Sequence, residues 1–164
     1  MILSDVEIKR AIEEGEIIIE PIPSEEQYTT SALDLLLGDE ILKLKTSKEL
    51  GVEEPDGVDR PVIVDLSRID PRTLFQKYGE PVQKDGDGAF VLEPQEFVLG
   101  ITREYVGLPR HSRIAARVEG RSTLARLGLV VHLTAPTIHA GFEGHVVLEM
   151  CNFGPYKLRL HTGK

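Results

Sequence analysis

Short apolar runs bounded by glycine or proline dominate this chain of 164 residues, which contains 15 Gly and 10 Pro. Runs of a few residues that end at turn-forming residues are typical of β-strands. Many short strands with few helices indicate an all-β sandwich or barrel. Because 41% of the residues are hydrophobic, one core can form, and we expect a single mostly β domain over residues 1–164.

The predicted strands are spread along the whole chain. They cover residues 17–19, 41–45, 61–66, 90–92, 96–102, 114–118, 129–133, 146–150 and 157–160. Residues 46–60 predict a loop, and the sequence KDGDG at 84–88 predicts a turn. We expect 129–133 and 146–150 to pack at a subunit interface, because a small β domain gains from covered strand edges.

Two short helices are also expected. Ser4 and Glu7 form a capping box before an N-terminal helix that Gly15 can end. The second helix is expected over residues 70–78, with Asp70 as its N-cap.

The charge is spread unevenly along the chain. The net charge of −8 argues against general nucleic-acid binding. Residues 101–164 hold nine Lys/Arg and four Asp/Glu, a formal charge of +5. A basic segment in an acidic protein fits the capture of a small anion. The alternative is that the four arginines in residues 113–126 form a solvated strand face.

The remaining composition narrows the class of protein. One cysteine, Cys151, excludes an internal disulfide and a multi-cysteine metal site. No apolar run is long enough for a transmembrane helix, and the N-terminus lacks the features of a signal peptide. We therefore expect a cytoplasmic protein with neither a membrane nor a nucleic acid as partner.

The sequence GRSTLARLG at residues 120–128 indicates a phosphate site. One helical turn is expected at 124–127, capped by Ser122 and ended by Gly128. Hydroxyls, guanidiniums and amides at a helix start are the donors that phosphate oxygens prefer. The loop offers Arg121, Ser122, Thr123 and Arg126. A capped turn with surface arginines is the alternative interpretation.

A single acid, Glu149, stands among apolar residues in HVVLEM at residues 145–150. A buried carboxylate needs a partner, a cavity or a raised pKa, and such a group suits general acid–base chemistry. An outward-facing strand glutamate is the alternative. His139 is equally a polar turn residue or a functional one, His132 is expected in a core or interface, and Asp34 can anchor a turn.

Several segments together resemble the dCTP deaminase family of the trimeric dUTPase-like superfamily. They are RSTLARLGL at 121–129, VHLTA at 131–135, AGFEGHVVLEM at 140–150, SDVEIKRAIEEGEIIIEP at 4–21, SALDLLLG at 31–38 and EPQEFVLGITREYVGLP at 93–109. The resemblance covers most of the chain. Leucine stands at Leu36, where arginine is common in the family.

The resemblance implies a mostly β fold, a distorted β-barrel or sandwich of the dUTPase-like type with a short N-terminal helix. It implies a homotrimer whose active sites are shared between subunits. It also implies deamination of dCTP to dUTP and ammonia in the synthesis of dUMP and dTTP. Glu149 would activate water for attack on C4 of cytosine, and Ser122 and the backbone carbonyl of Ala135 would place that water.

The resemblance also implies a set of substrate-binding residues. The triphosphate, with its Mg²⁺, would be held by the loop residues Arg121, Ser122, Thr123, Leu124, Ala125 and Arg126. The main chain near Val147 and Leu148 would line the base pocket, and His139 would lie near the sugar. Zinc is not expected, because zinc nucleobase deaminases carry an H-x-E…P-C-x-x-C pattern that a chain with one cysteine lacks.

Two departures from the family pattern leave alternatives open. His139 stands where the family has aspartate, the residue that activates water in related dUTPases. The family's last strand and C-terminal tail do not appear within residues 1–164. A dUTP diphosphatase, a bifunctional enzyme converting dCTP to dUMP, and a non-catalytic nucleotide-binding trimer are the competing hypotheses.

Overall fold

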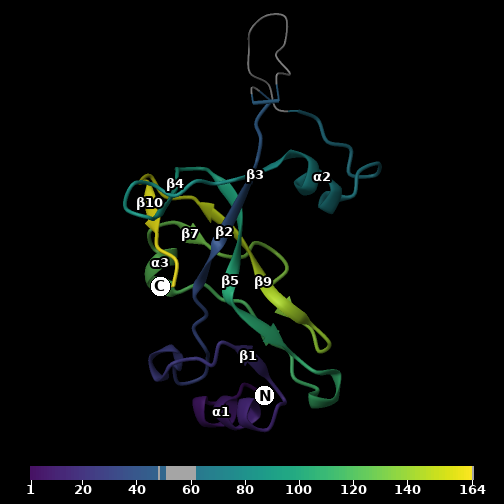
Figure 1. Ribbon diagram of the computed structural model, residues 1–164, viewed down its shortest axis with the longest axis vertical. Coiled ribbons are helices and arrows are strands. Elements are labelled where there is room, and N and C mark those ends of the chain that lie inside the picture. The colour runs from purple at the N-terminus through teal and green to yellow at the C-terminus, as the bar shows by residue number, and fades with distance from the viewer. Residues whose placement is uncertain (48, 51–61, 164) are drawn as a thin grey trace, which may run out of the picture.

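The computed structural model describes residues 1–47, 49–50 and 62–163, and it is mostly β as predicted. Its largest sheet has six strands, all paired antiparallel. These are β1 (Ile18–Glu20), β2 (Leu37–Leu44), β3 (Gly79–Pro81), β5 (Phe97–Gly107), β7 (Leu129–Val130) and β9 (Glu143–Asn152). The order is β3-β2-β5-β9-β7, with β1 paired to β5, and Figure 1 shows β5 and β9 as the long central strands.

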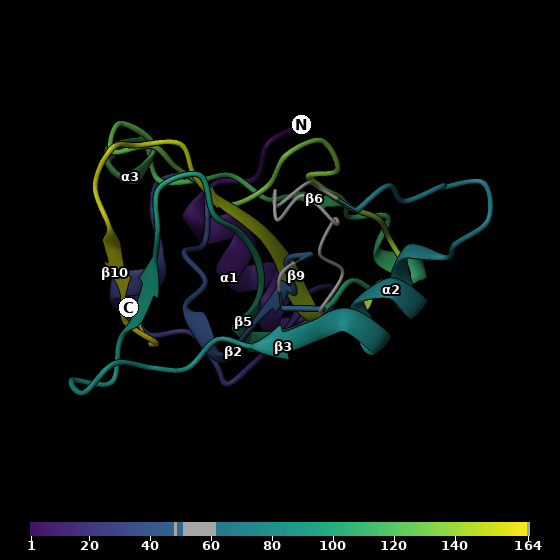
Figure 2. The ribbon, with the colours of Figure 1, turned by 90° about the horizontal axis from the view of Figure 1, so that it is seen from above.

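Two small antiparallel sheets complete the strand pairing. One joins β4 (Phe90–Leu92) to β10 (Leu158–Leu160), and the other joins β6 (Ala116–Arg117) to β8 (Thr137–Ile138). Figure 2 shows β10 and α2 on opposite sides of the long strands. Among the described residues the three sheets do not close into a hydrogen-bonded barrel, so the expected distorted barrel is an open arrangement.

The two predicted helices are confirmed, and each has the expected cap. α1 (Asp5–Glu13) begins after Ser4 with a complete capping box, and Gly15 follows its end with a left-handed φ of 72°. α2 (Pro71–Tyr78) begins after Asp70, whose side chain accepts a hydrogen bond from the Arg72 amide. Two 3₁₀ turns, Glu25–Gln27 and Arg110–Ser112, were not predicted. None of the helices in the described ranges has the length and apolar character that spanning a bilayer requires.

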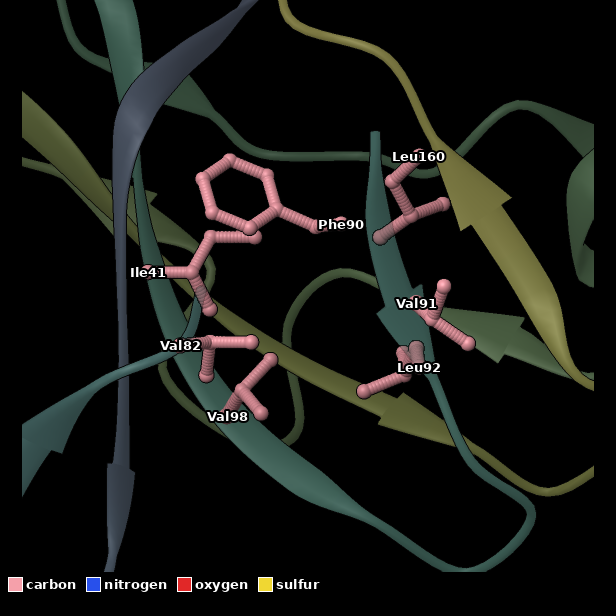
Figure 3. Close-up of a pocket in the computed structure, with 7 residues that line it drawn as sticks. All are labelled: Ile41, Val82, Phe90, Val91, Leu92, Val98 and Leu160. Atoms are coloured by element: carbon pink, nitrogen blue, oxygen red, sulfur yellow. The ribbon is translucent and has the colours of Figure 1, made fainter. Parts of the chain in front are cut away.

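The core lies between the large sheet and the β4–β10 pair. Figure 3 shows side chains from β4 and β10 facing those of β2 and β5, and the seven residues drawn there leave no room for a water molecule. They are Ile41, Val82, Phe90, Val91, Leu92, Val98 and Leu160. A second buried cluster, Ile19, Val106, Leu108 and Val146, lies at the α1 end, and Leu148 packs against both clusters.

Several predicted strands have different bounds, and one is absent. Residues 62–66 are exposed and form no strand, so the strand predicted at 61–66 is wrong over the described part; residue 61 lies outside the described residues. The run of valine and isoleucine there has no neighbouring strand to pair with, and β-propensity depends on such pairing. The strand at 129–133 shrinks to two residues, whereas the predicted strands at 96–102 and 146–150 lengthen to β5 and β9. In the predicted loop 46–60, residues 46, 47, 49 and 50 form no strand, and the remainder lies outside the described residues.

Candidate active site

The predicted phosphate loop contains a single helical turn, α3 (Ser122–Ala125). It begins two residues earlier than predicted, and its N-cap is Arg121. The predicted role of Ser122 as the cap is wrong, because Ser122 is the first helical residue and no side chain caps the turn. The Ser122 and Thr123 hydroxyls therefore remain available for another acceptor or donor.

Two glycines fix this loop against the β9–β10 connection. Gly128 has a left-handed φ of 94°, and its carbonyl accepts a hydrogen bond of 2.8 Å from the Phe153 amide. A Cβ atom on Gly128 would collide with the backbone of Gly154. The close approach of the two backbones explains why glycine follows the turn. This contact fixes the position of α3, whose polar side chains are exposed.

The loop presents unsatisfied donors to solvent. Ser122, Thr123 and Arg126 are exposed, and their side chains make no hydrogen bond or ion pair to any of the described residues. Arg121 differs, because its Nη2 donates to Oδ2 of Asp34, which is half-buried. Two free hydroxyls, the free Arg126 guanidinium and the remaining nitrogens of Arg121 are chemically suited to an anion with several oxygens.

Glu149 lies on β9 with its side chain half-buried. Its Oε2 accepts a hydrogen bond of 3.0 Å from the Leu133 amide. The side chain of Leu133, whose amide makes this bond, is 46% exposed. The side chain of Val147, two residues before Glu149 on the same face of β9, is 56% exposed. The alternation along β9 does point Glu149 away from the core, but the segment at Leu133 covers it.

The segment 131–136 connects Glu149 to the phosphate loop. The Val118 amide donates to the Pro136 carbonyl at 2.8 Å. Gly120 lies so close to this segment that a Cβ atom on it would be 3.3 Å from Cγ2 of Val131. The segment, which includes the exposed Ala135, thus contacts the start of the phosphate loop on one side and Glu149 on the other. No direct hydrogen bond or ion pair joins Glu149 to residues 120–128 within the described ranges.

β9 offers free backbone groups beside Glu149. β7 pairs only with Cys151 and Asn152, so in the described part of the chain residues 146–150 have a strand neighbour on the β5 side alone. Val147 and Leu148 belong to this half-paired stretch. Unpaired amides and carbonyls at a sheet edge can bind the polar edge of a planar base.

The two histidines near these segments occupy different environments. His139 is exposed and begins a turn, in which its carbonyl accepts from the Phe142 amide at 3.1 Å. Its side chain contacts neither Glu149 nor the phosphate loop among the described hydrogen bonds. His132 is half-buried, its Nε2 lies 4.0 Å from a carboxylate oxygen of Glu119, and its buried Nδ1 has no partner in the described part of the chain.

In the described part of the chain, the residues predicted to bind substrate form no cluster of metal ligands and lie outside an open cavity. Within the described residues no group of three or more His, Cys, Asp or Glu side chains is placed to hold a metal ion. An open cavity of about 430 Å³ lies between residues 37–40 and 101–103, with His145 and residues 162–163 at its wall. Its lining includes none of the residues predicted to bind substrate.

Sequence reasoning missed a buried polar cluster behind Asp34. Glu104 is 1% exposed, and its two oxygens accept from Gln27 Nε2 and the Leu36 amide, each at 2.9 Å. The period-2 alternation would have found Glu104, because inward positions on β5 recur from Val98 to Val106 and Glu104 is in phase with them. The predicted strand ended at Thr102 and so left Glu104 outside the pattern.

Comparisons with known proteins agree with the fold and the motifs. A family model described as dCTP deaminase-like matches residues 2–164. A protein of Methanosphaera stadtmanae named "dCTP deaminase, dUMP-forming" is 38% identical over 165 residues, which cover 99% of this chain and 74% of the relative. A protein of Rhodospirillum rubrum named "dCTP deaminase" is 39% identical over 163 residues, which cover 99% of this chain and 77% of the relative.

A solved structure supports the fold. The crystal structure of 2'-deoxycytidine 5'-triphosphate deaminase from Agrobacterium tumefaciens matches with a TM-score of 0.65 and 18% sequence identity. The match covers 99% of this chain but spans only 44% of that chain, and it is evidence for the fold alone. The family model and the two sequence relatives carry the classification: the chain belongs to the dCTP deaminase-like family.

Proposed function

We propose that this protein is a hydrolase that deaminates dCTP to dUTP and ammonia. Its relatives are named for dCTP deamination, and the chain shares 38–39% of its residues with two of them. The observation that carries the proposal is the position of Glu149. It is half-buried on β9 and hydrogen-bonded to the segment that also contacts the phosphate loop.

Glu149 is the proposed general acid–base group. Its Oε2 is engaged by the Leu133 amide, so Oε1 is available to accept a proton from water. The hydroxide adds to C4 of the cytosine ring while Glu149 passes the proton that it took from water to N3 of the ring. Glu149 then takes the proton of the new C4 hydroxyl and gives it to the amine, so that the C4–N bond breaks, ammonia leaves and the C4 carbonyl of uracil forms. One water enters and one ammonia leaves. Ser122 and the carbonyl of Ala135 are proposed to place the water.

The exposed loop is the proposed triphosphate site. Arg121, Ser122, Thr123 and Arg126 supply charged and neutral donors, and Leu124 and Ala125 contribute the backbone of the same turn. Magnesium is proposed to arrive with the substrate, where it neutralises phosphate charge, because Mg²⁺ is commonly held by nucleotide phosphates together with few protein ligands. The formal charge of +5 over residues 101–164 favours the approach of this anion.

A homotrimer with shared sites is the proposed assembly. The exposed Leu133 and Val147 beside Glu149 would be buried by a second copy, which removes apolar surface from water and dries the surroundings of the carboxylate. The main chain at Val147 and Leu148 would then face the base from one subunit, and the phosphate loop would belong to a neighbour. Sedimentation at several protein concentrations tests this assembly, and a stable monomer that deaminates dCTP contradicts it.

A product assay tests the activity. The protein is incubated with dCTP, dUTP or CTP in the presence of Mg²⁺, and ammonia and pyrophosphate are measured separately. We expect ammonia and dUTP from dCTP with little pyrophosphate, because His139 replaces an aspartate at the position used for water activation in related dUTPases. Because several relatives are named dUMP-forming, pyrophosphate in step with ammonia would assign the bifunctional reaction instead. Nucleotide binding without ammonia release would favour the hypothesis of a non-catalytic nucleotide-binding trimer.

A further inference from the structure

Beyond the residues expected to touch the nucleotide, the structure contains a buried polar cluster that ends at the phosphate loop. Its innermost member is Glu104, one of the largest fully buried side chains of the protein. An ionisable group is rarely buried without hydrogen-bond partners, because losing its hydration is costly. Both Glu104 oxygens are occupied, one by Gln27 and one by the Leu36 amide.

Glu104 faces inward in phase with the alternation along β5, and it lies at a local irregularity of that strand. The pairing of β5 with β9 shifts register between Ile101 and Tyr105, and Glu104 lies inside that shift. Thr102 stabilises the irregularity, because its hydroxyl donates to the Glu104 carbonyl at 2.8 Å and accepts from the Val146 amide at 2.9 Å. Irregularities of this kind are common next to active sites.

Gln27 connects Glu104 to Asp34. Its Nε2 donates both to Glu104 and to the Asp34 carbonyl, each at 2.9 Å. Its own carbonyl accepts from the Asp34 amide at 2.8 Å, and its Oε1 accepts from the Ser24 amide at 3.0 Å. The backbone of Asp34 is therefore held on both sides by one residue, and that residue is held by the buried acid.

Asp34 connects the buried cluster to the phosphate loop. Its carboxylate accepts from Nη2 of Arg121, the N-cap of α3. The described contact uses only this nitrogen, so Nη1 and Nε of the guanidinium face no other described partner. A guanidinium fixed at one edge can present its other edge to a phosphate without a further loss of side-chain entropy.

We infer that Gln27, anchored by Glu104, is a positioning residue that holds Asp34 so that Asp34 pre-orients Arg121 for the substrate triphosphate. The inference rests on the proposed function of the same loop. It assigns to Asp34 an aligning role, although its charge is of the same sign as the phosphate. The opposite role, in which Asp34 competes with phosphate for Arg121, predicts tighter phosphate binding when Asp34 is neutralised.

Two measurements on three variants of the 164-residue chain test the inference. Asp34→Asn removes the charge of the carboxylate with little change in shape. Gln27→Leu removes the side-chain hydrogen bonds of Gln27 to Glu104 and to the Asp34 carbonyl. Glu26→Gln is the matched control, because Glu26 is exposed on the same 3₁₀ turn and makes no described hydrogen bond or ion pair. Binding of inorganic tripolyphosphate is measured by calorimetry, and KM and kcat for dCTP are measured by ammonia release.

We expect Asp34→Asn and Gln27→Leu each to weaken tripolyphosphate binding about three- to fivefold, the effect of a partly exposed ion pair. KM for dCTP should rise by a similar factor while kcat stays within about twofold, because phosphate anchoring is common to the ground state and the transition state. The control should match the wild type. A purely structural role would instead lower the melting temperature and leave the tripolyphosphate affinity of the folded fraction unchanged.

The outcomes separate this inference from the proposed function. Unchanged or tighter tripolyphosphate binding by Asp34→Asn overturns the aligning role, even if the enzyme releases ammonia. Absence of tripolyphosphate binding in the wild type also overturns it. Wild-type protein that binds tripolyphosphate with the expected variant pattern but releases no ammonia supports the positioning role and removes the deaminase activity. Should Gln27→Leu fail to fold, Asp34→Asn decides.

Discussion

Replacement of Asn152 by alanine should cost about 3 kcal/mol of folding free energy. Asn152 is fully buried, and its side chain makes three hydrogen bonds. Nδ2 donates to the carbonyls of Leu92 at 3.1 Å and Tyr156 at 2.7 Å, and Oδ1 accepts from the Gly154 amide at 3.0 Å. Each buried group left without a partner costs about 1–3 kcal/mol. We use the low end for the three groups, because water entering the vacated space would satisfy part of the loss.

Urea unfolding followed by circular dichroism measures this cost. Both proteins are compared at one protein concentration, since subunit association shifts apparent stability. Gln83→Ala is the control, because Gln83 is exposed and its side chain bonds to no other described residue; its effect should stay within about 0.5 kcal/mol. A loss below about 1 kcal/mol for Asn152→Ala, with an unchanged m value, would refute the reasoning that these three bonds stabilise the β9–β10 connection.

Two further predictions concern the phosphate loop and acid stability. Gly128→Ala should weaken tripolyphosphate binding by at least tenfold, because its Cβ atom would collide with the backbone of Gly154 and α3 would have to move; binding within twofold of the wild type would contradict this. The amide of Ala89, followed by other donors including Arg159, holds the pKa of Asp85 below its usual value. The stabilisation from Asp85 is thus present above the unfolded-state pKa and is lost as pH falls through the folded-state pKa. In melting curves from about pH 7 to pH 2, Asp85→Asn should lower the melting temperature near neutrality and not at the acid end, whereas a difference that persists or grows in acid would be inconsistent with this sign.

Local signals predicted the parts of the fold that depend on local chemistry. The capping box at Ser4 and Glu7 and the N-cap at Asp70 placed both helices, because cap hydrogen bonds are made within a few residues of sequence. Strand β4 was predicted with its observed bounds for a similar reason, since turns flank it on both sides. Tertiary pairing decided the strand at 61–66, which finds no partner, and β3, whose glycine and proline gave no strand signal.

The connections between the proposed site residues could not be predicted from the sequence. The residue pattern singled out Glu149 and the arginine–hydroxyl loop, the resemblance added Ala135, and the structure adds the segment 131–136 that contacts both. No pattern in the sequence could show that the Leu133 amide binds Glu149, because the bond joins an irregular segment to β9 and spans 16 residues. The ion pair between Asp34 and Arg121 spans 87 residues, so the sequence pattern could not predict it either, although that pattern singled out both residues.

Ammonia release by the Glu149→Gln variant tests the central claim most directly. Glutamine keeps the size of the side chain and an oxygen for the Leu133 amide, but it cannot take a proton from water near neutral pH. We expect wild-type protein to release ammonia from dCTP. The variant should release it at least about 100-fold more slowly while binding tripolyphosphate with wild-type affinity. Ammonia release by Glu149→Gln at a rate near that of the wild type would contradict the assignment of Glu149 as the proton-transfer group.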